Sequence, residues 1–291
     1  MTERTVYALG FFDGVHLGHQ ALLQACRELA DGLGLTAAVL TFDRHPAGLV
    51  SGQAPSLINR AEDREQLLRH YGMDHVLALP FDEELMHTPW QAFVARLLEE
   101  HHAAGLVCGE DFRFGDRGEG NAELLKKACA RANIPCVVVP EQKVDGVRVS
   151  STYIRGLLEA GQMEEAVRFL GHPHILTGKV VAGQQLGRTL GIPTANLLLP
   201  EGVVCPKLGV YACKAGEHLA VTNVGMRPTV NGHHVTVEPW ILDFEGDLYG
   251  KELTLGFYAF LRPEQKFDSL EELQTEIRKN AQQTRNFFGK K

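Results

Sequence analysis

The sequence lacks the marks of several protein classes. Its 291 residues contain no run of eighteen apolar residues, and the stretch MTERTVYALGFF carries no charged-then-apolar leader that ends in small residues. The six cysteines form no C-x-x-C pair, so neither a structural zinc site nor a disulfide scaffold is expected. These absences predict a cytoplasmic protein with reduced cysteines that are mostly buried.

Basic charge is also scarce. The 29 lysines and arginines are outnumbered by 36 aspartates and glutamates, which gives a formal net charge of −7 at pH 7. This balance argues against nucleic acid or an anionic membrane as the main partner. The composition, with 44% hydrophobic and 8% aromatic residues, is that of an ordinary globular protein, and the length favours two domains.

Strand-like runs alternate with helix-period segments through the first half of the chain. The runs are VYALG, LTAAVLTF, HVLALPF, GLVCGED and PCVVVPE, at residues 6–10, 35–42, 75–81, 105–111 and 135–141. Between the first two, Leu22, Cys26, Leu29 and Leu33 recur with a helical period. This alternation predicts an α/β fold, with a parallel sheet buried on both faces.

From about residue 175 the pattern changes to strands that follow one another through Gly, Asn and Pro turns. These strands are HILTGKVVA, KLGVYACKA, HLAVTNVG, HVTVEPWILDF and ELTLGFYAFL, and the helical segment SLEELQTEIRKNAQQTRNFF follows them. The pattern predicts an antiparallel barrel or sandwich with a C-terminal helix. Two short helices lie between the halves, so we expect domains at residues 1–172 and 173–291.

A first candidate site lies in GFFDGVHLGHQALL, where the first strand ends and the first helix begins. Ligands of open α/β sheets bind at such a junction, and a helix N-terminus offers free N–H groups to an anion. His16 and His19 could hydrogen-bond phosphate oxygens, while Gly18 leaves the backbone open to a ligand. The alternative is two solvated rings at an ordinary helix start. A hydrolytic metal site would need a third ligand, and none lies at suitable spacing.

Further polar clusters follow other predicted strands of the first half. TFDRHP, GEDFRFG and RVSSTYIR follow the strands at residues 35–42, 105–111 and 135–141. In the last of them, two guanidinium groups and two hydroxyls stand at a helix start, which suits a polyphosphate. A Ser/Thr cap beside surface arginines is the alternative. A P-loop is absent, and the fingerprint-like GLGLTA closes a helix instead of opening one.

The second half contains two further candidates. Glycines surround Arg188 in GKVVAGQQLGRTLGIPTAN, and Thr194 and Asn196 could share a hard cation such as Mg²⁺ from one side of an extended segment. Glu238 is a lone carboxylate in an apolar strand, which suits a general base for attack on a γ-phosphate. An ordinary capped loop and a solvated barrel position are the respective alternatives.

The motifs of the first half resemble, in order, those of the adenylyltransferase domain of bacterial bifunctional riboflavin kinase/FAD synthetases. The resemblance implies a Rossmann-like nucleotidyltransferase fold in which His16 and His19 stabilise the α-phosphate of ATP. It implies that Arg148, Ser151, Thr152 and Arg155 hold the β,γ-phosphates and pyrophosphate, and that Asp111 helps to form the nucleotide and flavin pocket. The other nucleotide-binding positions it implies are Gly10, Phe12, Gly14 and Gly18.

The second half is similar to the β-barrel riboflavin kinase domain of the same family. The resemblance implies that Thr194 and Asn196 bind Mg²⁺ with ATP, that Glu238 is the base for the ribityl 5′-hydroxyl, and that residues 178–191 form a flap. The ATP- and flavin-binding positions it implies are Gly178, Lys179, Gly183, Arg188, Gly191, Pro193, Asn223 and Arg227.

Five residues depart from the family pattern. These are Phe11, where many members carry Asn; Arg44, where Pro is usual; the pair Pro239 and Trp240 after the Glu; and Asn280, where an acidic residue is frequent.

Taken together, the resemblance implies an enzyme that phosphorylates riboflavin to FMN and adenylylates FMN to FAD. ATP and Mg²⁺ serve both steps, and riboflavin, FMN and FAD are substrates or products. The implied partners are small molecules, with no nucleic acid or membrane, and the implied state is a monomer or a weak homo-oligomer. A flavin- or nucleotide-binding regulator that has lost one or both activities is the alternative.

Overall fold

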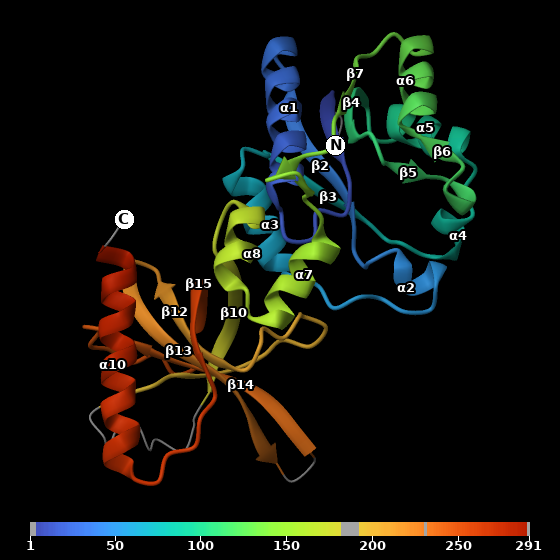
Figure 1. Cartoon of the computed structure of the whole chain (residues 1–291). Helices are drawn as coiled ribbons and strands as arrows, with labels where there is room; N and C mark the ends of the chain where they lie inside the picture. Colours follow the sequence, from blue (N-terminus) through green and yellow to red (C-terminus); the bar gives the residue numbers. More distant parts are fainter. Residues whose placement is uncertain (1–3, 182–191, 230–231, 290–291) are drawn as a thin grey trace. The chain divides into compact units, whose positions relative to one another are not determined.

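The computed structural model describes residues 4–181, 192–229 and 232–289, and of residues 227–229 and 232–234 it describes the backbone alone. The chain forms two compact units (Figure 1). The first unit comprises Met1–Ser56 and Arg64–Ser150, and the second comprises Leu57–Asp63 and Ser151–Lys291. Each unit has its own sheet and is described separately below.

The first unit is built on a parallel sheet of five strands in the order β3-β2-β1-β4-β7. Its strands are β1 (Thr5–Leu9), β2 (Thr36–Phe42), β3 (His75–Leu79), β4 (Ala103–Gly109) and β7 (Cys136–Val139). Because β2 and β3 extend the sheet on one side of β1 and β4 and β7 on the other, the strand order reverses at β1. An open α/β sheet binds ligands at such a switch point, outside the carboxyl ends of the strands.

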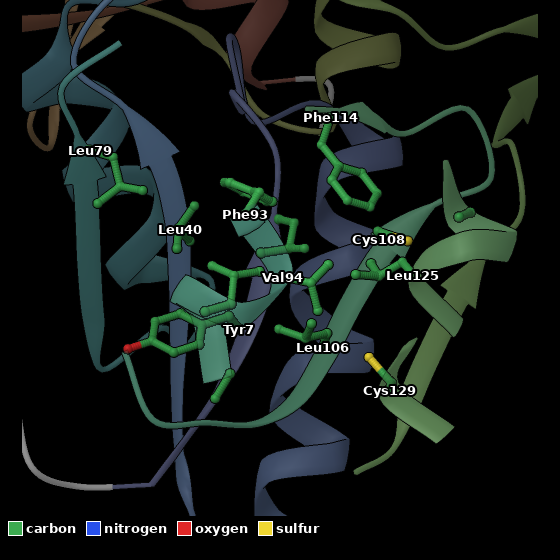
Figure 2. Close-up of a cluster of buried hydrophobic side chains, with 14 of the residues drawn as sticks. Tyr7, Leu40, Leu79, Phe93, Val94, Leu106, Cys108, Phe114, Leu125 and Cys129 are labelled. Atoms are coloured by element: carbon green, nitrogen blue, oxygen red, sulfur yellow. The ribbon is translucent and has the colours of Figure 1, made fainter. Parts of the chain in front are cut away.

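Helices cover both faces of this sheet. On one face, α1 (Leu17–Leu33) packs its buried Leu23, Cys26 and Ala30 against β1, β2 and β4. On the other, α5 (Trp90–Glu99) and α6 (Ala122–Arg131) close a core with alternate strand residues such as Tyr7 and Leu106 (Figure 2). Since successive strand side chains point to opposite faces, one apolar strand supplies both cores.

Short helices and hairpins lie in the connections that join the strands of the first unit and follow its last strand. They are α2 (Ala47–Val50), α3 (Ala61–His70), α4 (Glu83–Met86), the hairpin β5 (Arg113–Phe114) and β6 (Gly120–Asn121) around a 3₁₀ turn (Asp116–Gly118), and the hairpin β8 (Lys143–Val144) and β9 (Val147–Arg148). The last hairpin separates β7 from most of the motif RVSSTYIR, whose first residue, Arg148, ends β9.

The second unit is a closed barrel of six strands in the order β10-β11-β14-β13-β12-β15, and all its pairs are antiparallel. Its strands are β10 (His174–Val181), β11 (Asn196–Leu198), β12 (Gly209–Ala215), β13 (His218–Thr229), β14 (Gly232–Ile241) and β15 (Glu252–Pro263). Closure pairs the strand edges that an open sheet would leave exposed.

Three helices and one crossing segment cover this barrel. Helix α10 (Leu270–Gly289) packs on β12 and β13, and α8 (Met163–Leu170) packs on β15 and also contacts α7 (Ser151–Ala160). The segment Leu57–Asp63 also belongs here: Leu57 donates its N–H to the Gly202 carbonyl at 2.7 Å and accepts one from Val204 at 2.8 Å.

These observations confirm the predicted fold class. The parallel sheet with flanking helices is present, and of the two alternatives for the second half the structure is the barrel, followed by the C-terminal helix. The stretch GLGLTA ends α1 at the left-handed Gly34 and leads into β2, which is the reverse of a dinucleotide fingerprint. The functional boundary at residue 172 stays a prediction.

His174 predicts an acid sensitivity of the second unit. Its ring is fully buried, neither ring nitrogen has a hydrogen-bond partner, and burial lowers its pKa to about 3. In the unfolded chain His174 binds a proton at about pH 6.5, whereas the folded protein keeps the ring neutral down to about pH 3. Between these two pH values protonation favours the unfolded chain, so the free energy of unfolding falls as the pH falls. Between pH 7 and pH 5 the second unit should lose about 2 kcal/mol of unfolding free energy through this group.

Urea unfolding in a Trp90→Phe background measures this loss, because Trp240 of β14 is then the one tryptophan left. His174→Leu should flatten the pH dependence. The exposed His218 lies in the same unit, so His218→Leu is the matched control and should leave it unchanged. Equal slopes for wild type and His174→Leu between pH 7 and pH 5 would contradict the prediction.

Candidate functional site

The turn between β1 and α1 is forced into an uncommon backbone conformation. Phe12 and Val15 adopt positive φ angles of 61° and 39°, with Gly14 at 81° between them. Non-glycine residues pay about 1–3 kcal/mol each for such angles. The side chains of Phe12 and Val15 are fully buried, so apolar burial offsets that cost and holds the turn.

His16 and His19 lie together at the start of α1. His16 is the N-cap, and its Nδ1 accepts the backbone N–H of His19 at 3.3 Å. The two rings stack with centroids 3.6 Å apart and planes 11° from parallel. His16 is only 6% exposed, so the alternative of two solvated rings at a helix start does not describe this pair.

The environment keeps His19 uncharged at neutral pH. Burial lowers its pKa well below the usual value, and the neighbouring His16 and Arg64 lower it further. A neutral imidazole donates one hydrogen bond and accepts another. The buried Nδ1 of His19 has no hydrogen-bond partner in the described structure, which leaves the ring ready for a ligand.

Two small residues let the turn close on itself. A Cβ at Gly18 would lie 3.2 Å from Cε1 and Nδ1 of His16, and one at Gly10 would lie 3.1 Å from the Phe12 ring. The glycines therefore make room for neighbouring rings, a reason that spacing alone did not indicate.

Sequence reasoning missed two charged residues beside this turn. Asp13 and Arg64 are 2% and 4% exposed, and the Asp13 carboxylate counteracts the lowering of the Arg64 pKa that burial causes. Asp13 belongs to the motif GFFDGVHLGHQALL, but an Asp-Gly pair is an ordinary turn signal and does not mark a buried charge. Arg64 gave no signal, because a charged residue on a short polar helix is usually solvated.

Asp111 and Arg148 come from different segments of the first unit and lie together. Arg148 of β9 forms an ion pair with Asp111, which follows β4, and its Nε lies 2.7 Å from Oε1 of Glu141. All three groups are at least 30% exposed, so the pairing is weak and a phosphate could replace the carboxylates. The other three proposed phosphate ligands, Ser151, Thr152 and Arg155, lie in the first turns of α7 in the second unit.

A cavity of about 730 Å³ opens in the first unit. Its lining is largely aromatic and aliphatic, with a polar rim. The lining residues are Phe42, Pro46, Leu49, Val50, Phe81, Leu85, Met86, His87, Phe93, Arg113, Phe114, Gly115, Asp116, Arg117 and Gly118. The last three residues of GEDFRFG line this cavity, but the sequence alone could not reveal it, because its walls come from segments that are separate along the chain.

In the barrel, Glu238 lies among polar neighbours on three adjacent strands. Its Oε1 accepts the Thr236 hydroxyl at 2.9 Å, and Asn223 of β13 is its cross-strand partner. On the other side Leu197 pairs with Val237 and the Ala195 N–H donates to the Pro239 carbonyl at 3.0 Å, so the same register sets Asn196 beside Glu238. Glu238 is half-buried, which is not the fully solvated position of the alternative.

Thr194 lines a smaller cavity of about 80 Å³ in the same unit. The remaining walls are Val180, Pro193, Ala195, Pro239, Ile241, Phe244, Gly246, Asp247, Leu248 and Tyr249. Asn196 is buried in β11, whereas Thr194 precedes the strand, so their projection to one side stays a prediction.

The donor chemistry of Thr194 and Asn196 fits a hard cation, because a hydroxyl and an amide oxygen are the ligand types Mg²⁺ accepts beside phosphate oxygens and water. Within the described ranges, no three histidine, cysteine or carboxylate side chains gather as a metal site, and this includes the surroundings of His16 and His19.

The remaining kinase candidates are only partly described. Gly178 and Lys179 lie in β10, where a Cβ on Gly178 would come within 3.3 Å of Leu197. Gly183, Arg188 and Gly191 lie outside the described residues, as does most of the expected flap. Arg227 lies in β13, and its side chain is not described.

The residues that depart from the family pattern all find partners or packing. Phe11 contacts His45 edge to face at 4.7 Å and Arg64 by its ring face, and Arg44 pairs with Asp43 on the surface. The side-chain oxygen of Asn280 accepts a hydrogen bond from Nε of Arg262 at 3.1 Å, which an acidic side chain at this position could also accept.

The pair after Glu238 also departs from the family pattern. Trp240 packs beside a buried cluster that includes Val210 and Leu242, while Pro239 is buried in β14 and accepts the Ala195 N–H.

Comparison with known proteins divides the chain into two domains. A family model described as FAD synthetase matches residues 1–153, and one described as riboflavin kinase matches residues 170–288. The bifunctional riboflavin kinase/FMN adenylyltransferase of Listeria monocytogenes is 39% identical over 98% of this chain and 93% of its own length. That of Escherichia coli is 38% identical over 99% of this chain and 94% of its own.

A solved structure has the same fold along nearly the whole chain. The crystal structure named as a macrolide-efflux protein from Streptococcus pneumoniae aligns with a TM-score of 0.88 and 31% identity, and covers 98% of this chain and 95% of that one. Among the described residues, no helix is both long and apolar enough to span a bilayer. With both domain models in order and relatives matched end to end, the chain belongs to the bifunctional riboflavin kinase/FMN adenylyltransferase family.

Proposed function

We propose that this chain phosphorylates riboflavin to FMN in its barrel and adenylylates FMN to FAD in its α/β unit, with ATP as the donor in both steps. The observation that carries the proposal is the stacked pair of His16 and His19 at a helix N-terminus, in the part of the chain matched by the FAD synthetase model. A regulator without activity is not favoured, because the end-to-end relatives carry the names of enzymes.

In the adenylyl transfer, a phosphate oxygen of FMN attacks the α-phosphorus of ATP, and the bond from that phosphorus to the pyrophosphate oxygen breaks. The non-bridging α-oxygens gain negative charge in between. The N-terminus of α1 and the N–H groups of His16 and His19 supply donors for that charge. We assign the β,γ-phosphates and the departing pyrophosphate to Arg148, Ser151, Thr152 and Arg155. Positioning and charge stabilisation suffice for such a step.

The cavity of about 730 Å³ is our candidate for the isoalloxazine ring of FMN. Its size suits a small-molecule site, and the Phe42, Phe81 and Phe114 walls offer aromatic faces to a flat heterocycle. Asp111 does not line this cavity, and we assign it to the nucleotide and flavin pocket at the nearby strand end, where it pairs with Arg148.

In the kinase step, the riboflavin 5′-hydroxyl attacks the γ-phosphorus of ATP, and ADP leaves. Glu238 accepts the hydroxyl proton, and the Thr236 hydroxyl bond orients its carboxylate. Thr194 and Asn196 would hold Mg²⁺, which when bound neutralises phosphate charge. We assign ATP and flavin binding to the residues around this point: Gly178, Lys179, Gly183, Arg188, Gly191, Pro193, Asn223 and Arg227.

Cytoplasmic residence is part of the proposal, supported by the six cysteines, all of which are free thiols. The expected small-molecule partners, the lack of nucleic-acid and membrane partners, and a monomeric or weakly associated state stay predictions.

Two substitutions should separate the activities. Glu238→Gln should lower FMN formation from riboflavin by 10²- to 10⁴-fold, the usual effect of losing a general base, while FAD formation from supplied FMN persists. His19→Ala should do the reverse. Chromatography of flavins after incubation with ATP and Mg²⁺ measures both. Loss of both activities in either variant would refute two independent sites.

A capping variant controls for helix damage. His16→Asn removes the imidazole but keeps a side chain that caps helices well, whereas His16→Ala loses both and should cost about 1 kcal/mol of stability. Both should lose FAD synthesis to a similar degree. If His16→Asn kept wild-type activity, His16 would act only as a cap.

Filling the large cavity should weaken FMN binding. Leu49 lines it and is 38% exposed, so Leu49→Trp should raise the KM for FMN in adenylylation at least several-fold without changing riboflavin phosphorylation. Leu33→Trp is the matched control, since Leu33 is a 46% exposed leucine of the same unit that does not line the cavity. Equal KM values for the two variants would show that the flavin does not bind in this cavity.

A further inference from the structure

Arg64 lies beside the first site but has no role in the chemistry proposed above. Its side chain is 4% exposed, and its guanidinium carbon lies 4.3 Å from the centroid of the Phe11 ring. Nη2 donates to the Phe42 carbonyl at 3.2 Å, and Nη1 is buried without a hydrogen-bond partner. Burying a cation costs free energy, so a position that retains one calls for an explanation.

These contacts join the ends of two neighbouring strands. Phe11 follows β1 and opens the turn that leads to His16, while Phe42 is the last residue of β2. The Thr41 hydroxyl also donates to the Phe11 carbonyl at 3.1 Å. One guanidinium therefore holds the start of the turn by a cation–π contact and holds the adjacent strand end by a hydrogen bond.

The charge of Arg64 acts on the histidine pair as well. Asp13 is the buried carboxylate that favours the charged form of Arg64, and Arg64 in turn disfavours the charged form of His19. The rings that contact His19 are those of His16 and Phe12, with centroids 3.6 and 5.1 Å away, and the Arg64 cation acts on it electrostatically. The buried cation of this site is therefore Arg64, paired electrostatically with Asp13, and not the His19 ring.

We propose that Arg64 is a positioning residue for adenylyl transfer: its guanidinium, held on the Phe11 ring and on the Phe42 carbonyl, fixes the start of the turn that presents His16 and His19. Together with burial, its charge also disfavours a proton on the His19 ring. The proposal rests on the function proposed for this site. A neutral imidazole has a single N–H, so the orientation of the ring decides whether a phosphate oxygen receives that hydrogen bond. A small misplacement of such a group can cost two orders of magnitude in rate.

The test compares Arg64→Met, Arg64→Lys and the control Arg69→Met, which removes an arginine of the same helix that is 50% exposed and paired with Glu65. In each, kcat and KM are measured for FAD formation from FMN and ATP, and the His19 ring is titrated by NMR. Arg64→Met should lower kcat at least about tenfold, leave the KM for ATP within about twofold, and raise the His19 pKa.

Arg64→Lys separates the two roles, because it keeps the charge but loses the planar fork. Its His19 pKa should stay near that of the wild type while kcat still falls. Arg69→Met should match the wild type in both measurements.

Wild-type kcat in Arg64→Met, or an unmoved His19 titration, would overturn the proposal. Should Arg64→Met fail to fold, wild-type kcat in Arg64→Lys would overturn it instead. If the wild type makes no FAD, the proposed function is wrong, and the role of Arg64 in adenylyl transfer is wrong with it. A His19 pKa that still rises in Arg64→Met would then show that Arg64 and His19 are coupled electrostatically, independently of that function.

Discussion

The first site depends on one constraint, which is the left-handed turn between β1 and α1. Buried side chains on Phe12 and Val15 hold backbone angles that these residues avoid elsewhere. The turn ends at His16, which caps the helix and stacks on His19. A looser turn would leave the same residues in the chain but would not present two rings at the helix N-terminus.

Around that turn, charge is arranged by burial. Arg64 is a cation that cannot easily lose its proton, so it keeps its charge despite being nearly enclosed, whereas the His19 ring responds to the same burial by staying neutral. Asp13 supplies the compensating negative charge. The result is an uncharged His19 ring at a helix N-terminus, which is a suitable environment for a phosphate that gains charge during transfer.

The barrel site is made by register instead of by a turn. Antiparallel pairing sets Asn223, Glu238 and Asn196 side by side on three adjacent strands, although they come from distant parts of the chain. A shift of one residue would send the Glu238 side chain to the opposite face of the sheet. Closure of the barrel holds that register, because every strand is paired on both edges.

The amino-acid sequence was enough to predict an α/β first half, an antiparallel all-β second half with a C-terminal helix, and the candidate residues His16, His19, Thr194, Asn196 and Glu238. It could do so because hydrophobic period and local motifs act over a few residues. The tertiary structure alone decided the stacking of the histidines, the burial of Arg64, the aromatic cavity and the membership of Leu57–Asp63 in the barrel unit. These features join residues far apart in the chain, and such contacts leave no local pattern, since the same letters would suit a solvated helix or an exposed loop.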